Sequence, residues 1–311
     1  MVISHSRTAS PADRESRQGL ALGLTAYVIW GLSTGWFKLM PHIPPLEIVA
    51  HRAAWAVPFA VCVLLLMGGG TSLMPVLRNW KIMRVLMVSA TIIVCNWSMF
   101  IWAVANGKML EASLAYYINP LVSVLLGFVL LRERLSRSQV VAIALAGSAV
   151  VLQTVAEGIF PGLALTIATT FAVYGYLRKT VPVGAVQGFL VETLLMLPFS
   201  IAAIAWFELT GQGHMFTAPA DILYLLACTI VTGVPLMMFS AAARRLPLST
   251  LGLMQYVAPT IGFAIAVWVF NEPLTWVTLV AFILIWIALA IFSWAAFSGR
   301  RASLSPPPSA P

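Results

Sequence analysis

Ten apolar stretches of about twenty residues follow one another along this chain, separated by short polar segments. An α-helix needs about 20 apolar residues to cross a hydrocarbon core that is ~30 Å thick. Because 60% of the residues are hydrophobic and only 9% are charged, one soluble core could not bury this much apolar surface. The sequence therefore predicts an all-α integral membrane protein with ten transmembrane helices. The spans are expected at residues 19–39, 45–67, 82–105, 109–131, 138–156, 160–178, 185–207, 221–243, 248–270 and 275–297.

The basic residues gather on one side of these predicted spans, and only Lys38 and Lys108 fall on the other side. The fifteen residues on the favoured side are Arg7, Arg14, Arg17, Arg78, Lys81, Arg84, Arg132, Arg134, Arg137, Arg178, Lys179, Arg244, Arg245, Arg300 and Arg301. Cytoplasmic loops of membrane proteins carry an excess of Lys and Arg, so both termini are predicted to be cytoplasmic. The net charge of +8 is then a topology signal, and no nucleic-acid partner is expected.

The cysteines and the chain ends give little indication of function. Cys62, Cys95 and Cys228 lie in apolar runs without paired spacing, so neither a disulfide framework nor a cysteine metal site is expected. Residues 1–18 and 299–311 are polar or proline-rich and are predicted to be disordered cytoplasmic tails.

An internal repeat organises the chain into two halves. Pro120 and Glu133 recur as Pro259 and Glu272 at a constant offset of 139 residues. The halves cover residues 19–157 and 158–298 with five predicted spans each. Because five is odd, the second half enters the membrane from the opposite side, which predicts an inverted repeat. The charges agree, since the cytoplasmic turn Arg132-Glu133-Arg134 corresponds to Asn271-Glu272-Pro273 on the outer side.

Pro120 and Pro259 are the predicted bending points of two equivalent helices, because proline removes a backbone donor and opens the helix locally. Tyr116 and Asn119 fall on one face of the first helix, and Gln255 takes the place of Tyr116 on the second. Two interpretations stay open. The face lines a substrate cavity through these hydrogen-bonding groups, or it packs two helices tightly without any ligand.

Arg52 and Glu192 are ionisable groups in repeat-equivalent places inside predicted spans. Such a group costs about 2.5–3.5 kcal/mol on insertion scales, so it normally faces a cavity or a partner. We expect the two side chains to face a central cavity, where they pair with each other or bind the charged ends of a zwitterionic substrate. The competing interpretation is structural, with each side chain fixing helices through backbone carbonyls or extending to an interface.

His51 is able to titrate near neutral pH, and Glu47 lies one helical turn before it. Proton coupling through this pair is one interpretation, and a hydrogen-bonded structural histidine is the other. The four histidines, at positions 5, 42, 51 and 214, are scattered along the chain, and no two carboxylates have metal-binding helical spacing. We therefore expect no metal site and no cofactor.

Several motifs together resemble a known family. They are Trp30-Gly31, Glu47-Ile-Val-Ala-His51-Arg52, Asn96-Trp97, Leu110-Glu111-Ala-Ser, Tyr116-Tyr117-Ile118-Asn119-Pro120, Leu248-Ser-Thr-Leu-Gly252 and Gln255-Tyr256-x-x-Pro259. The chain resembles the EamA branch of the drug/metabolite transporter superfamily, and within it the RarD-type permeases, over residues 18–298. The resemblance implies a ten-helix inverted-repeat bundle with a central cavity in the bacterial cytoplasmic membrane, which transports small metabolites or drugs.

The resemblance also adds residues to the expected cavity. Trp30 and Trp102 are placed on its wall for flat, amphipathic substrates, together with Asn96, Tyr117 and Tyr256. The expected function is secondary transport of small metabolites or amphipathic drugs by alternating access, in the direction of export.

The other function classes are distinguished by motifs. A His-Glu-x-x-His sequence, an Asp-rich metal motif and a Gly-x-x-x-x-Gly-Lys phosphate loop are all missing from the sequence, so no enzyme and no ATP-driven pump is expected. A channel or membrane sensor stays open as an alternative, because it needs none of these motifs. The sequence leaves the oligomeric state open.

Overall fold

The computed structural model describes residues 11–304 except 38, 68–72, 107–108, 159, 270 and 272–274, and the described residues contain helices but no strand. The helices are α1 (Pro11–Phe37), α2 (Pro45–Leu66), α3 (Met74–Arg78), α4 (Trp80–Ala105), α5 (Met109–Leu131), α6 (Arg137–Glu157), α7 (Gly162–Thr180), α8 (Ala185–Leu209), α9 (Pro219–Ala243), α10 (Leu248–Met254), α11 (Val257–Trp268) and α12 (Trp276–Leu304). Lys38, Lys108 and Glu272, which entered the topology and repeat predictions, lie outside the described residues.

Eight helical stretches are long and apolar enough to cross a membrane, and this establishes an all-helical, multi-pass membrane protein. The stretch 248–265, which contains α10 and most of α11, is one of the eight, whereas α1 and α7 are not among them. In α7 the reason is its composition, because Arg178 and Lys179 in the last turn of this 19-residue helix lower its mean hydropathy. Its face with Ala164, Ala168 and Ala172 is buried against other helices, so it does not need the hydropathy of a lipid-facing helix.

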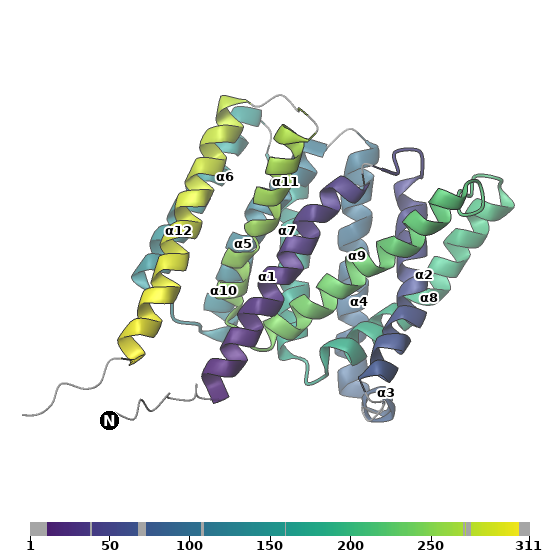
Figure 1. The fold of residues 1–311 in the computed structure, drawn as a ribbon, viewed down its shortest axis with the longest axis horizontal. Coiled ribbons are helices and arrows are strands. Elements are labelled where there is room, and N and C mark those ends of the chain that lie inside the picture. Colours follow the sequence, from purple (N-terminus) through teal and green to yellow (C-terminus); the bar gives the residue numbers. More distant parts are fainter. Residues whose placement is uncertain are drawn as a thin grey trace, which may run out of the picture.

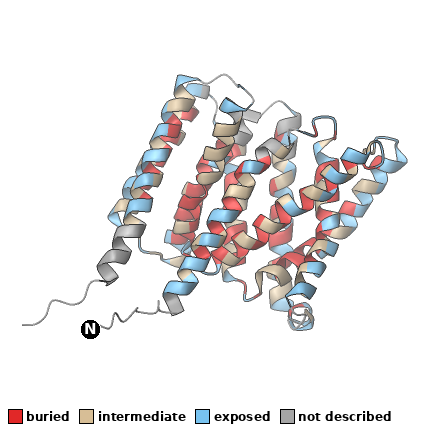
Figure 2. Cartoon of the chain, in the orientation of Figure 1, coloured by how far each residue is buried: buried red, intermediate tan, exposed pale blue. Residues whose placement is uncertain are grey.

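The helices form a layered bundle with the core between its layers (Figures 1 and 2). At one end of the bundle α6 packs on α12, and at the other end α2 packs on α8. Between these pairs, α5 contacts α7 and α10, while α1 contacts α9 and α11. Buried residues gather on the inner faces of the helices, and α1 begins on the same side of the bundle on which α12 ends.

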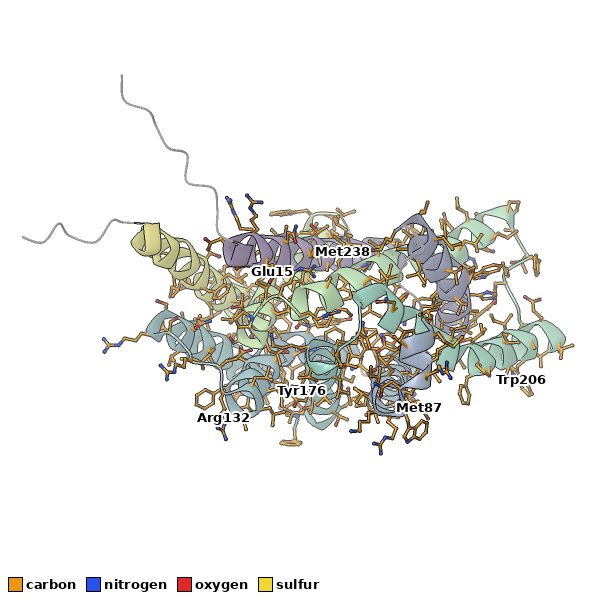
Figure 3. All side chains as sticks on the ribbon, turned by 90° about the horizontal axis from the view of Figure 1, so that it is seen from below. Glu15, Met87, Arg132, Tyr176, Trp206 and Met238 are labelled. Atoms are coloured by element: carbon orange, nitrogen blue, oxygen red, sulfur yellow. The ribbon has the colours of Figure 1, made fainter. Side chains whose placement is uncertain are left out.

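Large apolar side chains also cover the outside of the bundle. Met87 is 44% exposed and Trp206 is 66% exposed, and both extend outward in Figure 3. An outer surface of this kind is suited to hydrocarbon rather than to water.

The helix ends and the ninth predicted span differ from the prediction. Helix α1 begins at Pro11 and α12 continues to Leu304, so the segments 11–18 and 299–304, predicted to be disordered, are helical. Helix α5 runs through Pro120 without a break, whereas Gln255 and Tyr256 separate α10 from α11. The ring of Pro259 would clash with the carbonyl of Gln255 in a regular helix, and that carbonyl instead accepts the N–H of Ala258 at 3.1 Å.

Candidate functional site

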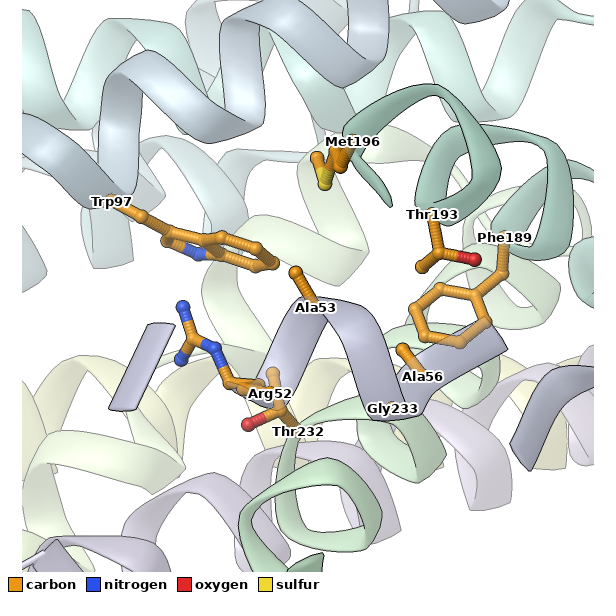
Figure 4. A pocket seen from close by; sticks show the side chains of 9 residues that line it. All are labelled: Arg52, Ala53, Ala56, Trp97, Phe189, Thr193, Met196, Thr232 and Gly233. Atoms are coloured by element: carbon orange, nitrogen blue, oxygen red, sulfur yellow. The ribbon is translucent and has the colours of Figure 1, made fainter. Parts of the chain in front are cut away.

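A small cavity lies where α2, α4, α8 and α9 meet (Figure 4). Its lining is mostly apolar and consists of Arg52, Ala53, Ala56, Trp97, Phe189, Thr193, Met196, Thr232 and Gly233. The small residues let the helices approach closely; a Cβ atom on Gly233, for example, would lie only 3.2 Å from the ring of Phe189. The cavity has a volume of about 10 Å³, which is room for one water molecule and too small for a metabolite in this conformation.

Arg52 is the charged side chain of this cavity. Its guanidinium lies over the indole of Trp97, with Cζ 4.0 Å from the ring centroid. A cation–π contact of this kind contributes ~2 kcal/mol when it is desolvated. The buried Nε of Arg52 has no hydrogen-bond partner. An unpartnered cation donor beside an aromatic ring is suited to an anionic group with an apolar body attached to it.

Glu192 lies in α8 but does not pair with Arg52. Its carboxylate accepts a hydrogen bond from Ser89 Oγ at 2.5 Å and one from the Tyr174 hydroxyl at 3.3 Å. Its ionic partner is Arg178 of α7, with Nη1 3.7 Å from Glu192 Oε1. The pairing of Arg52 with Glu192, one of the two arrangements expected from the sequence, is therefore corrected. Arg52 lines the cavity, whereas Glu192 does not, although Phe189, Thr193 and Met196 of the same helix do.

Arg178 is the main residue that sequence reasoning missed. Its position in the last turn of α7 led to the prediction that it marks the cytoplasmic side, yet its side chain is completely buried. The guanidinium donates to Ser240 Oγ at 3.2 Å and to the Ala185 carbonyl at 3.1 Å, so it joins α7 to α8 and α9. The missed signal is Glu192 itself, because a carboxylate buried in a span requires a counter-charge.

Gly188 makes room for this ion pair. A Cβ atom on Gly188 would lie 2.0 Å from Arg178 Nη1 and 2.7 Å from Arg178 Cζ. Contacts that short are not tolerated, so any side chain at this position requires the guanidinium to move. The glycine, one turn before Glu192 in α8, is therefore part of the same constellation.

Trp97 is the second residue that was missed, since the sequence indicates it only as the neighbour of Asn96. The side chain of Asn96 instead donates to the Ile167 carbonyl at 2.7 Å and to Thr170 Oγ1 at 2.9 Å, which fastens α4 to α7. Trp30 packs in an aromatic cluster, with ring centroids 6.0 Å from Phe171 and 5.9 Å from Phe239. Neither Asn96 nor Trp30 lines the cavity.

Tyr116 and Trp102 are both exposed, and the hydroxyl of Tyr116 interacts electrostatically with the guanidinium of Arg52. Tyr116 is 47% exposed and its ring packs on Phe100, with centroids 5.8 Å apart. Trp102 is 50% exposed. His51 is buried beside Glu47, with Nε2 3.9 Å from Glu47 Oε1, and it does not line the cavity either.

The remaining predicted residues lie where α5 meets α10 and the α10–α11 junction. The hydroxyl of Tyr256 donates to the carbonyl of Tyr117 at 2.9 Å, and both residues are buried. Asn119 accepts from Ser123 Oγ at 3.2 Å within α5, and Gln255 is 7% exposed at the break between α10 and α11. This part of the predicted face is a packed helix contact in the observed conformation.

Comparisons with known proteins agree with this description of a membrane-embedded helical bundle. Residues 17–155 match the EamA-like transporter family. An uncharacterized transporter of Pseudomonas aeruginosa is 44% identical over 287 residues, which cover 92% of this chain and 96% of that protein. The protein RarD of Escherichia coli is 43% identical over 294 residues, with 93% and 99% covered. A solved crystal structure that is 20% identical shares the fold with a TM-score of 0.70, covering 90% of this chain and 98% of that one.

Proposed function

The chain belongs to the EamA-like transporter family, and from this premise we propose that it is a secondary transporter of the bacterial cytoplasmic membrane. It moves small metabolites or amphipathic drugs by alternating access, in the direction of export. The observation that carries this proposal is Arg52, a cation held over Trp97 in a small, mostly apolar cavity between four helices.

The proposed architecture is ten transmembrane helices in two inverted repeats, residues 19–157 and 158–298. Support comes from pairs of residues that are separated by the repeat offset. Tyr117 and Tyr256 are 139 positions apart and are joined by a hydrogen bond. Arg132 and Asn271 have the same offset, and both adopt a left-handed backbone, with φ of 53° and 52°. Such a matched pair of unusual conformations after equivalent helices is expected of two copies of one design.

The helix contacts support the same symmetry. If α1 corresponds to α7, α4 to α9 and α5 to α10 and α11, then the contact of α1 with α9 has its copy in the contact of α7 with α4. The contact of α5 with α7 likewise has its copy in that of α11 with α1. The pairs α2 with α8 and α6 with α12 lie on the proposed axis.

Both termini are proposed to be cytoplasmic. The basic residues predict this orientation, and the described chain begins and ends on the same side of the bundle (Figure 1). The ion pair between Arg178 and Glu192 then lies toward the cytoplasmic side of the cavity, because Arg178 is in the last turn of α7.

Alternating access needs this cytoplasmic side to open. We assign the closure there to the network of Arg178 and Glu192, which ties α7, α8, α4 and α9 together through Ser89, Tyr174 and Ser240. Movement of α8 away from α7 would separate the pair and widen the cavity from one water molecule to the size of a metabolite. Within the open cavity, Arg52 would bind an anionic group of the substrate, and the apolar part would lie against Trp97, Phe189 and Met196.

The test is uptake and counterflow in vesicles reconstituted with the purified protein. A carrier gives saturable uptake that is accelerated by substrate on the opposite side, whereas the alternative, a channel, gives conductance without saturation. A membrane sensor gives neither. Proton coupling stays a prediction for the same assay, and flux that is unaffected by an imposed pH gradient excludes it.

A further inference from the structure

Six ionisable side chains meet on the side of the bundle opposite the chain ends, where α1 connects to α2 and α8 connects to α9 (Figure 1). They are His42, Glu47, His51, Glu208, His214 and Asp221. From the sequence we expected no metal site, because the histidines are scattered. The fold removes that reason by bringing three of them together.

Three members of this group have the arrangement of metal ligands. One ligand atom each from Glu47, His51 and Glu208 can be chosen so that all three lie within 4.8 Å of one another. Tetrahedral ligands at zinc bond lengths of about 2.0–2.2 Å are separated by about 3.4 Å. Glu208 is exposed at the end of α8, so its flexible side chain is able to close the remaining distance.

His51 is the observation that points to a ligand. The imidazole is 1% exposed, and neither Nδ1 nor Nε2 has a hydrogen-bond partner. Its Nε2 lies 3.9 Å from Glu47 Oε1, which is too far for a hydrogen bond but suitable for two groups on either side of one ion. Buried polar atoms are normally satisfied, so an imidazole left without any partner among carboxylates requires an explanation.

The surroundings orient the other two groups. Glu47 is completely buried, and it accepts from the backbone N–H of His214 at 2.6 Å while its second oxygen lies 2.8 Å from His214 Nδ1. A carboxylate held this way by a second histidine is typical of an outer-shell contact to a metal ligand. The carboxylate of Glu208 lies against Gly213, where a Cβ atom would be 2.6 Å from Glu208 Cδ. Any larger residue at position 213 would displace it.

We propose that Glu47, His51 and Glu208 bind one divalent transition-metal ion of the zinc type. Two carboxylates neutralise the charge of the dication, and the mixture of one imidazole nitrogen with carboxylate oxygens favours zinc over magnesium or calcium. Three protein ligands leave one position for water. The ion ties α2 to the end of α8, and binding does not depend on whether the chain transports any particular substrate.

The test is metal binding by the full chain, purified in detergent without a histidine tag and stripped with a chelator. Equilibrium dialysis against Zn²⁺ is expected to give one ion per chain, and Co²⁺ is expected to give an absorption spectrum of nitrogen and oxygen ligands. Glu208→Gln lies at the surface and should fold, and it should weaken Zn²⁺ binding at least tenfold. Gly213→Ala should weaken it as well, whereas the exposed carboxylate variant Glu15→Gln, on the opposite side of the bundle, should bind as the unaltered protein does.

Three results would overturn the proposal. The first is absence of stoichiometric Zn²⁺ binding to the unaltered chain. The second is unchanged affinity in Glu208→Gln. The third is loss of binding in His42→Gln while Glu208→Gln retains it, which would place the ion at the neighbouring pair of His42 and Asp221, whose Nε2 and Oδ1 atoms are 2.9 Å apart. Failure of transport in vesicles would leave each of these readings unchanged.

Discussion

Substituting Gly188 by alanine should break a buried ion pair without removing either of its charges. The added Cβ atom would lie 2.0 Å from Arg178 Nη1 and 2.6 Å from Nη2, so the guanidinium must leave its place beside Glu192. Arg178 is completely buried and Glu192 is 2% exposed, so little water is available to replace the lost contact. Breaking a buried pair costs about 3–5 kcal/mol, and we expect a loss of this size in the free energy of unfolding.

Chemical unfolding of the purified protein in mixed micelles measures this loss. Gly147→Ala in α6 is the matched control, because a Cβ atom there meets nothing within 4 Å. It should be neutral or stabilise the helix by about 0.5–1 kcal/mol, the usual difference between glycine and alanine. The reasoning is refuted if Gly188→Ala behaves like Gly147→Ala. It is also refuted if Gly188→Ala is equally destabilising in a background that carries Arg178→Met and Glu192→Leu, where no pair is left to break.

Three further substitutions test the remaining parts of the account. Trp97→Ala should raise the substrate concentration for half-maximal flux about tenfold, because Arg52 loses its cation–π contact, while Trp97→Phe should retain most of that contact. Equal half-maximal concentrations for Trp97→Ala and the unaltered chain in vesicle uptake would contradict the assignment. Glu133→Gln should cost about 0.5–2 kcal/mol of unfolding free energy. The carboxylate of Glu133 accepts hydrogen bonds from the backbone N–H groups of Leu248 and Ser249, the first two residues of α10, and from the Ser249 hydroxyl, whereas an amide has only one acceptor oxygen. Tyr256→Phe should cost about 0.5–1.5 kcal/mol through the bond to the Tyr117 carbonyl, and an unfolding curve that does not change would remove that contact from the account.

The helical class of the fold follows from the sequence because it depends on regular features. Apolar length predicts spans whatever their neighbours are. The spacing of Pro120 and Pro259 predicts two equivalent helices, and the structure packs α5, which contains Pro120, against α10. The different outcome at the two prolines depends on tertiary context, since α5 tolerates Pro120 while the chain breaks before Pro259. Proline chemistry alone does not distinguish these two cases.

The candidate site was harder to predict, because the sequence locates charges but not their partners. Arg52 was identified from its depth in a span, yet its contact with Trp97 depends on how α2 and α4 cross. Arg178 is one of many basic residues that the sequence predicts to be cytoplasmic, and only its burial distinguishes it from Arg132, which extends from the surface (Figure 3). His51 and His214 are far apart in the sequence and share the carboxylate Glu47 only after folding.

Counterflow in reconstituted vesicles tests the central claim most directly. Radiolabelled amino acids and amphipathic antibiotics, including chloramphenicol, would be offered to vesicles containing the unaltered chain or Arg52→Ala, with insertion of both proteins verified. We predict saturable counterflow of at least one compound with the unaltered chain and its loss with Arg52→Ala. Full counterflow by Arg52→Ala, or flux that rises linearly with concentration, would contradict a carrier that binds its substrate at Arg52.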